Sequence, residues 1–188
     1  MPRRVVSVFG GSAARPDQDD WREAERLGRR LATAGYAVAT GGYGGIMEAV
    51  SHGAAEAGGH VIGITCDDIE SWRTVQPNGW IREQIRVPRL RDRLVRLVEI
   101  GEALVAFPGG VGTLSEVALS WSMLQTGSLT PRPLVLVGEA WKKTLSTFLE
   151  AAGGYVGPAE HHLLVFQADG EQAADFIVNH LAGPLPTG

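Results

Sequence analysis

The amino-acid sequence predicts an α/β protein built on a Rossmann-like, doubly wound parallel sheet flanked by helices, and three observations lead to this prediction. Short apolar segments alternate with amphipathic segments of helical period along most of the chain, as in repeated strand–helix units. The interior apolar segments carry no polar face, which is typical of strands buried on both sides of a parallel sheet. Glycine-rich turns follow several of them. We therefore assign residues 1–183 to a single domain and residues 184–188 to a flexible tail.

The first half of the chain predicts three strands with two helices between them. The apolar runs indicate strands at 5–9, 36–40 and 60–65, and helical periodicity indicates helices at 21–34 and 46–57. Asp19 and Asp20 stand where the first helix begins and are expected to cap it. Gly35 and the Gly58–Gly59 pair follow the two helices, where glycine readily ends a helix.

The second half continues the alternation after one irregular stretch. Residues 67–79 show no sustained period and predict a long loop, a kind of segment that often serves as a lid or binding element. A short strand follows at 84–87. The remaining pattern predicts strands at 103–107, 133–137 and 163–166, and helices at 90–100, 112–126, 141–151 and 171–181.

Composition and charge exclude several classes of function. The formal net charge of −4 argues against a general nucleic-acid binder, since nothing neutralises a phosphate backbone in bulk. No apolar run reaches the roughly 20 residues of a membrane span, and the N-terminal segment lacks a signal-peptide pattern. The lone cysteine, Cys66, excludes an internal disulfide. We expect a cytoplasmic protein without a membrane partner.

Two glycine-rich turns are expected to meet at one crevice. Gly10, Gly11 and Ser12 follow the first predicted strand, and residues 108–113 follow the fourth main strand, 103–107. In the usual doubly wound order these two strands are neighbours at the point where the strand order reverses, which is where ligands bind.

The second of these turns has the composition of a phosphate-binding loop, consisting of Pro108, Gly109, Gly110, Val111, Gly112 and Thr113. Glycines let backbone amides approach an anion closely, and the N-terminus of the following helix adds free N–H groups and a favourable dipole. Thr113 would either cap that helix or donate its hydroxyl to a phosphate oxygen. Glu116 follows about one turn later, as a site residue or as a solvated carboxylate near the helix start.

A further glycine-rich loop comes after the second strand, with Gly42, Gly44, Gly45 and Met47 as candidate ligand contacts. It is neither a G-x-G-x-x-G fingerprint after the first strand nor a P-loop with its lysine. Nicotinamide-cofactor and nucleoside-triphosphate chemistry therefore lose their main support. Glu48 is either a ligand contact or an ordinary first-turn carboxylate.

Residues 108–116 match the PGGxGTxxE motif, and in this respect the chain resembles the LOG (Lonely guy) family, whose members are often mislabelled as lysine decarboxylases. The resemblance runs from about residue 9 to about residue 149. It implies a phosphoribohydrolase that cleaves the N-glycosidic bond of nucleoside 5′-monophosphates, cytokinin nucleotides among them, to a free base and ribose 5-phosphate. It also implies a homodimer or larger assembly that requires no metal or organic cofactor.

The resemblance assigns roles to individual residues. The glycine loop and Thr113 would hold the 5′-phosphate, and Glu116 would be the catalytic acid, placed to stabilise positive charge at the anomeric carbon or to activate water. The family's Met-His-x-Arg-Lys segment falls on residues 90–94, where Arg93 keeps the arginine while the methionine, histidine and lysine are replaced. Arg93 would orient Glu116, grip a ribose or phosphate group, or be a surface arginine among the six between positions 82 and 96.

A second function remains open beside hydrolysis. The glycine loop at 41–45 is one residue shorter than the family's usual form, and this region resembles a divergent branch that includes molybdenum-cofactor carrier-like proteins. A carrier or sensor would use the same anion site for a bound nucleotide, phosphate or molybdopterin-type ligand without cleaving it. Both hypotheses predict a phosphorylated small molecule as the partner.

Other chemistry has little support. A pyridoxal-phosphate decarboxylase needs a lysine imine, and the two lysines, Lys142 and Lys143, look like solvated residues at the start of a late helix. The histidines, including the His161–His162 pair in a predicted loop, show no metal-ligand spacing. The helix at 112–126 is apolar on more than one face, which indicates a buried core helix or a homo-oligomer interface.

Overall fold

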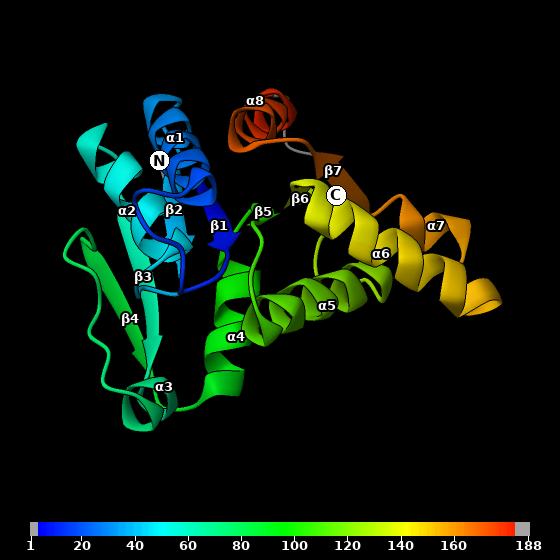
Figure 1. Cartoon of the computed structure of the whole chain (residues 1–188), viewed down its shortest axis with the longest axis horizontal. Helices are drawn as coiled ribbons and strands as arrows, with labels where there is room; N and C mark the ends of the chain where they lie inside the picture. The colour runs from blue at the N-terminus through cyan, green and yellow to red at the C-terminus, as the bar shows by residue number, and fades with distance from the viewer. Residues whose placement is uncertain (1–3, 183–188) are drawn as a thin grey trace.

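The computed structural model describes residues 4–182, so the N-terminal residues 1–3 and the predicted tail at 184–188 lie outside the described residues (Figure 1). The strands are β1 (Val5–Phe9), β2 (Ala37–Thr40), β3 (Val61–Cys66), β4 (Glu83–Val87), β5 (Ala103–Ala106), β6 (Leu134–Val137) and β7 (Leu164–Gln167). The α-helices are α1 (Asp19–Thr33), α2 (Ile46–Glu56), α3 (Asp67–Trp72), α4 (Leu90–Ile100), α5 (Val111–Gln125), α6 (Glu139–Ala152), α7 (Pro158–His161) and α8 (Gly170–Leu181), with a short 3₁₀ turn at Gly153–Tyr155.

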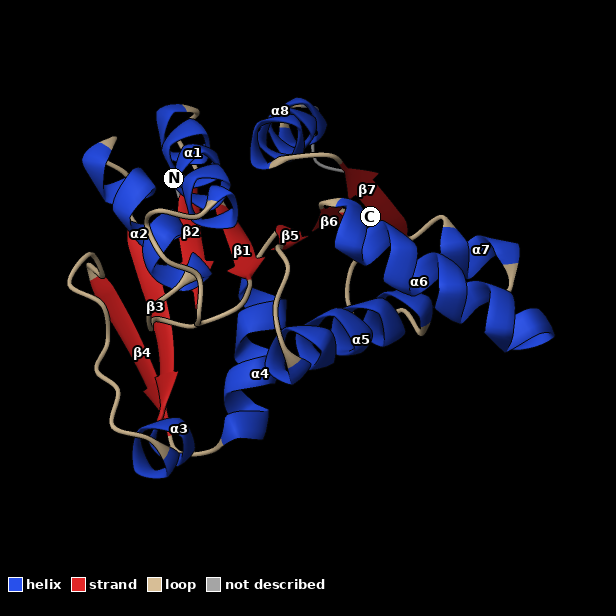
Figure 2. Ribbon diagram, in the orientation of Figure 1, coloured by secondary structure: helices blue, strands red, loops and turns tan. Residues whose placement is uncertain are grey.

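All seven strands form one parallel sheet in the order β4-β3-β2-β1-β5-β6-β7 (Figure 2). The strand order reverses between β1 and β5, which pair from Val6–Ala103 to Phe9–Ala106. This confirms the predicted Rossmann-like α/β fold and the predicted neighbours at the switch point. The carboxyl ends of these two strands carry the two glycine-rich turns to the same edge of the sheet.

Helices cover both faces of the sheet and define two apolar cores. Side chains from α1, α2 and α8 pack on one face, while α4, α5 and α6 pack on the other (Figure 1). The interior strands β2, β3, β5 and β6 are buried at every residue, as their apolar sequences predicted. The edge strands β4 and β7 are more exposed.

The close packing of α1 against α2 depends on two glycines. A Cβ on Gly28 would lie 2.3 Å from the carbonyl oxygen of Val50, and a Cβ on Gly53 would lie 2.0 Å from the carbonyl oxygen of Glu25. The absence of both side chains lets the two helix backbones approach each other directly over β1 and β2.

The predicted long loop at 67–79 is wrong in its first half, where α3 forms. No residue of α3 is buried, so the helix leaves no apolar period in the sequence. Asp67, Asp68 and Glu70 lie in its first turn, where carboxylates are favourable next to the helix N-terminus. The remainder of the segment runs without regular structure to β4.

Smaller corrections concern helix ends. Gln18 occupies the N-cap of α1, and Asp19 and Asp20 are its first two residues with no side-chain cap bond, so the predicted capping is wrong. Gly35 and Gly58 adopt positive φ angles of 89° and 76° after α1 and α2, as expected of glycines that end helices. His161 ends the short helix α7, where a loop was predicted, because Pro158 begins a helical turn there.

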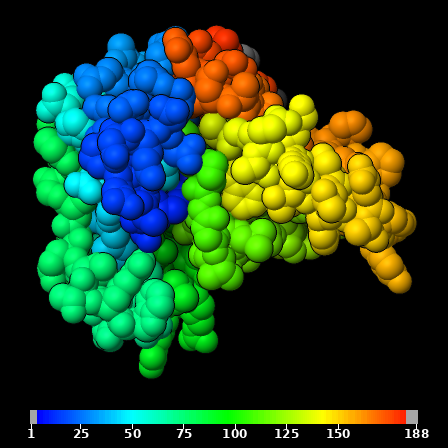
Figure 3. Space-filling model, viewed as in Figure 1, coloured from blue at the N-terminus to red at the C-terminus, as the bar shows by residue number. Residues whose placement is uncertain are grey.

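The pair α5–α6 and the helix α7 project beyond the edge of the main body, as the space-filling view shows (Figure 3). Within residues 4–182, no helix is both long enough and apolar enough to cross a membrane.

Candidate functional site

Three loops meet at the carboxyl ends of β1, β2 and β5. The amide of Gly11 donates to the carbonyl oxygen of Pro108 at 3.0 Å, and the carbonyl oxygen of Gly11 accepts from the amide of Ile46 at 2.9 Å. The turn after β1 is therefore hydrogen-bonded both to the loop after β5 and to the start of α2. The two loops converge as predicted, and the glycine-rich loop after β2 lies beside them.

Several glycines are required by this close approach. A Cβ on Gly10 would lie 2.4 Å from Cγ2 of Ile46, and one on Gly109 would lie 2.2 Å from Oγ1 of Thr113. Gly45 has a φ of 72°, and a Cβ there would lie 2.4 Å from the carbonyl oxygen of Gly11. These residues keep the loops in contact with one another.

No close contact requires glycine at positions 110 and 112. A Cβ at either position would meet nothing within 4 Å, and both residues are exposed together with Val111, where α5 begins. Gly110 is the N-cap of the fifteen-residue helix α5 and Gly112 its second residue, so the exposed stretch includes the helix N-terminus, whose first amides have no intrahelical partner. This is the geometry that an anion needs to reach backbone N–H groups.

Thr113 is the third residue of α5 and is buried beside Gly109. Gly110 occupies the N-cap, and α5 has no side-chain cap bond. Capping by Thr113 is therefore wrong, and the phosphate-facing role remains a prediction.

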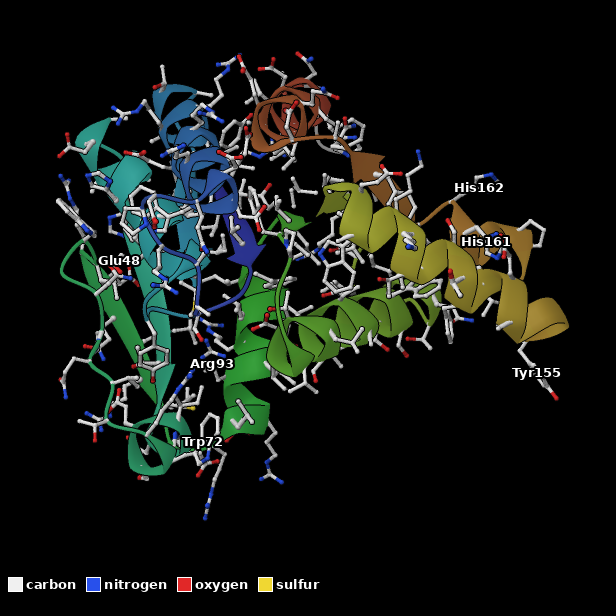
Figure 4. All side chains as sticks on the ribbon, in the orientation of Figure 1. Glu48, Trp72, Arg93, Tyr155, His161 and His162 are labelled. Atoms are coloured by element: carbon white, nitrogen blue, oxygen red, sulfur yellow. The ribbon has the colours of Figure 1, made fainter. Side chains whose placement is uncertain are left out.

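Arg93 is buried, with its side chain only 6% exposed, so a surface role is wrong (Figure 4). From α4 it extends under the glycine loops, where Nε donates to the carbonyl oxygen of Ile64 at 2.8 Å and Nη2 to that of Gly41 at 3.1 Å. A Cβ on Gly41 would lie 1.7 Å from Nη2, so glycine at this position makes room for the guanidinium. Met47 and the ring of Tyr43 also contact it.

Glu116 lies in the second turn of α5 and is also buried, so the solvated-carboxylate alternative is wrong. Its Oε1 is 3.6 Å from Nη1 of Arg93. Burial raises the pKa of Glu116 to about 7, against the opposing effect of the Arg93 charge. The carboxyl group therefore changes its protonation near neutral pH, as groups that act as acids and bases in active sites do.

The remaining predicted contacts line the same loops. Gly42 has a φ of 82°, and Gly44 lies next to the half-buried Glu48 in the first turn of α2. Met47 is buried against Arg93, so it contributes to the packing around the ion pair. Ser12 is exposed in the turn after β1.

Asn78 and Tyr43 hold the glycine-rich loop after β2 in place, and the sequence interpretation assigned neither of them this role. Asn78 donates from its backbone amide to the carbonyl oxygen of Gly42 at 2.8 Å and from its side chain to that of Tyr43 at 3.0 Å. The hydroxyl of Tyr43 accepts from the amide of Cys66 at 3.0 Å, and burial raises the pKa of Tyr43. The only signals were the Pro77-Asn78-Gly79 turn composition and an aromatic residue inside a glycine run.

A small cavity of about 200 Å³ adjoins the phosphate loop and is lined by residues of that loop and of α6, including Pro108, Gly110 and Trp141. Trp141 donates from Nε1 to the carbonyl oxygen of Phe107 at 3.0 Å, which fixes α6 against the end of β5. In the described part of the chain, no three histidine, cysteine or acidic side chains gather as metal ligands would.

Comparison with known proteins places this geometry in a family. The model of the SLOG cluster4 family matches residues 3–148. An uncharacterized protein of Archaeoglobus fulgidus is 32% identical over 145 residues, which are 73% of this chain and 87% of that protein. Cytokinin riboside 5'-monophosphate phosphoribohydrolase LOG5 of Arabidopsis thaliana is 31% identical over 169 residues, 85% of this chain and 71% of the relative.

Among solved structures, the molybdenum cofactor binding protein of the phototrophic bacterium Rippkaea orientalis is similar with a TM-score of 0.75. It is 27% identical, and the superposition covers 96% of this chain and 99% of that one. The similarity in sequence to phosphoribohydrolases and in structure to a cofactor-binding protein matches the predicted resemblance. The chain belongs to the SLOG cluster4 family and, with it, to the LOG-like proteins on the branch near the molybdenum cofactor carriers.

Proposed function

We propose that this protein hydrolyses the N-glycosidic bond of a nucleoside 5′-monophosphate, releasing a free base and ribose 5-phosphate. The observation that carries the proposal is the buried Glu116–Arg93 pair directly behind the glycine loop, with the pKa of Glu116 raised to about 7. A carboxyl group of this kind is placed for proton transfer near neutral pH. The similarity to phosphoribohydrolases supports the same reaction class.

The open amides at the start of α5, from Gly110 to Thr113, would bind the 5′-phosphate, with Gly10, Gly11 and Ser12 on the opposite side. The loop that includes Gly42, Gly44 and Gly45 would enclose the rest of the nucleotide. No metal or organic cofactor enters this proposal, because backbone amides supply the anion site and Glu116 supplies the proton chemistry.

The reaction breaks the bond between the anomeric carbon and the base nitrogen, and a bond from a water oxygen to that carbon replaces it. Positive charge develops on the sugar before the water attacks, and the carboxylate of Glu116 stabilises this charge and accepts a proton from the water. The departing base takes up the proton that Glu116 has accepted from the water, so atoms and charge balance and the carboxylate is restored. Glu116 acts in its ionised form in the attack step.

Arg93 is a positioning residue in this scheme rather than a ligand contact. Two of its nitrogens donate to the carbonyl oxygens of Ile64 and Gly41, and the third faces Glu116. Its positive charge lowers the pKa of Glu116 from the higher value that burial alone would produce. The altered residues around Arg93 leave this arrangement in place.

The test is incubation of the purified protein with AMP and related monophosphates, with chromatography to detect the free base. We expect base release that is lost in Glu116→Ala, while Glu171→Ala, which removes an exposed carboxylate from α8 away from the three loops, serves as the control. Absence of base release from every monophosphate would contradict the proposal.

A second function is favoured by a specific observation: a molybdenum cofactor binding protein superimposes on 96% of this chain. In that function the same crevice would hold a nucleotide or a molybdopterin-type cofactor without cleaving it. Retention of such a ligand through gel filtration, with no base release from monophosphates, would favour the carrier.

We also propose a homodimer or a larger homo-oligomer. The outer face of α5 and the facing side of α6 form a mostly apolar groove of about 490 Å³, with Trp121 and Leu145 among its lining residues. Phe148 and Tyr155 in this groove are 50% and 96% exposed, an unusual amount of apolar surface for a monomer. A second copy of the same helix pair would cover it.

A further inference from the structure

Residues 67–82 connect β3 to β4 and form a strap that crosses the glycine-rich loop after β2, residues 41–45. At its start, Glu70 of α3 lies 3.3 Å from the hydroxyl of Tyr43 and 2.9 Å from Nη2 of Arg86 on β4. Near its end, Asn78 donates to the carbonyl oxygens of Gly42 and Tyr43. The strap is therefore held at two points on the same loop.

Two large side chains lie between these anchors and contribute nothing to the core. Trp72 is 76% exposed at the end of α3 (Figure 4). Cζ of Arg73 lies over the Trp72 ring, 5.0 Å from its centroid, and Nη2 of Arg73 donates to Oγ of Ser12 at 3.4 Å. Arg73 thus extends from the strap to the turn after β1, which is one wall of the crevice.

The charge balance of the crevice makes this contact significant. The three loops, residues 10–12, 41–45 and 108–113, contain no lysine or arginine. Arg93 is committed to two carbonyl oxygens and to Glu116. A phosphate monoester carries nearly two negative charges at neutral pH, and arginine is the side chain best suited to bind two of its oxygens together.

We propose that Arg73 is a phosphate-binding residue of this site, carried by the strap and aligned by Trp72. The proposal rests on the proposed function only in taking a phosphorylated ligand in the same crevice. On binding, the guanidinium exchanges its long contact with Ser12 for charge-assisted hydrogen bonds to the phosphate oxygens, opposite the amides of α5. Trp72 keeps the guanidinium plane fixed, so that less conformational entropy is lost on binding.

Calorimetric titration tests the proposal with three probes, namely inorganic phosphate, AMP and adenosine. We expect Arg73→Ala to weaken binding of phosphate and AMP by at least about tenfold and to leave adenosine binding unchanged. Arg73→Lys should recover part of the affinity, because it keeps the charge and loses the paired donors. Arg82→Ala, which removes an exposed arginine from the other end of the strap, is the matched control.

Salt dependence and the Trp72 variant supply independent readouts. The affinity for AMP should fall less steeply with salt in Arg73→Ala than in the natural protein. Trp72→Leu should weaken AMP binding less than Arg73→Ala does, with the salt dependence kept, since the charge remains. Unchanged phosphate and AMP affinity in Arg73→Ala, or an equal loss in Arg82→Ala, would overturn the proposal.

These measurements do not depend on turnover. Loss of phosphate affinity in Arg73→Ala, in a protein that releases no base from any monophosphate, would support the role of Arg73 and contradict the hydrolase. Base release from AMP, with phosphate and AMP affinity unchanged in Arg73→Ala, would support the hydrolase and contradict the role of Arg73.

Discussion

The buried pair Arg93–Glu116 is the chemical centre of the molecule at the scale of single residues. A buried carboxyl group loses the solvation of its charged form, and Arg93 at 3.6 Å offsets only part of that loss. The pKa of Glu116 therefore remains near neutrality, at about 7. The group is available in both protonation states under ordinary conditions.

This raised pKa predicts how stability varies with pH. The folded protein binds the Glu116 proton more tightly than the unfolded chain, so this contribution to stability is complete below about pH 4.5 and is lost as pH rises through about 7. Glu116→Gln has no carboxyl group to ionise, so it avoids this loss of stability at higher pH. Relative to the natural protein, the variant should gain up to about 3 kcal/mol of unfolding free energy between pH 4 and pH 8.

Urea unfolding of both proteins across this pH range measures the difference. Glu171→Gln, which changes an exposed carboxylate on α8, is the control. A stability difference between Glu116→Gln and the natural protein that is the same at every pH would contradict the prediction.

Gly109 and Gly110 of the phosphate loop have different surroundings, so we expect valine to have different effects at the two positions. Gly110→Val places its side chain in open space at an extended φ of −92°, so we expect a change in stability within about 0.5 kcal/mol. The new side chain would cover the amides of α5, and phosphate binding should be abolished. Gly109→Val would instead clash with Thr113 and lower the thermal midpoint.

Phosphate titration together with thermal melts separates these effects. Gly110→Val that melts like the natural protein and still binds phosphate would remove the loop from the proposed site.

At the scale of elements, the spacing between α1 and α2 is set by backbone contact at Gly28 and Gly53. Apolar periodicity identified both helices, but it carried no information on how closely they approach. The helices are so close that a Cβ on Gly53 would lie only 2.0 Å from the carbonyl oxygen of Glu25.

Gly53→Ala is therefore expected to destabilise the protein although alanine is the better helix former. Overpacking costs about 1–3 kcal/mol, against roughly 1 kcal/mol gained in helix propensity. Gly112→Ala, in a helix with open space around it, should be neutral or stabilising. Chemical denaturation measures both, and greater stability in Gly53→Ala would show that the helices can move apart without cost.

The helix α3, which the sequence did not predict, directly precedes Arg73. Its six residues bury nothing, so no periodic pattern could reveal them. In contrast, α4 was predicted at its observed bounds because its apolar positions face the core. Apolar periodicity reports burial, and an exposed helix such as α3, whose Glu70 accepts a hydrogen bond from the hydroxyl of Tyr43, has no such periodicity.

At the scale of the whole molecule, the projecting α5–α6 pair predicts self-association. Phe148→Glu would place a charge in the apolar groove, and we expect it to shift the protein toward monomer. Sedimentation or light scattering measures the change. Leu90→Glu, which changes a 43% exposed apolar residue on α4 outside the groove, is the control, and an unchanged mass for Phe148→Glu would exclude this face as the interface.

The sequence by itself determined the alternation of strands and helices, the parallel sheet, and the two glycine turns at the switch point, because these follow from local period and chain direction. Only the tertiary structure decided that Arg93 is buried and pairs with Glu116, that Thr113 caps nothing, and that the strap brings Arg73 to Ser12. Each of these depends on segments distant in the chain meeting at particular atoms. Such contacts, and the desolvation that sets the pKa of Glu116, exist only once the loops have closed around them.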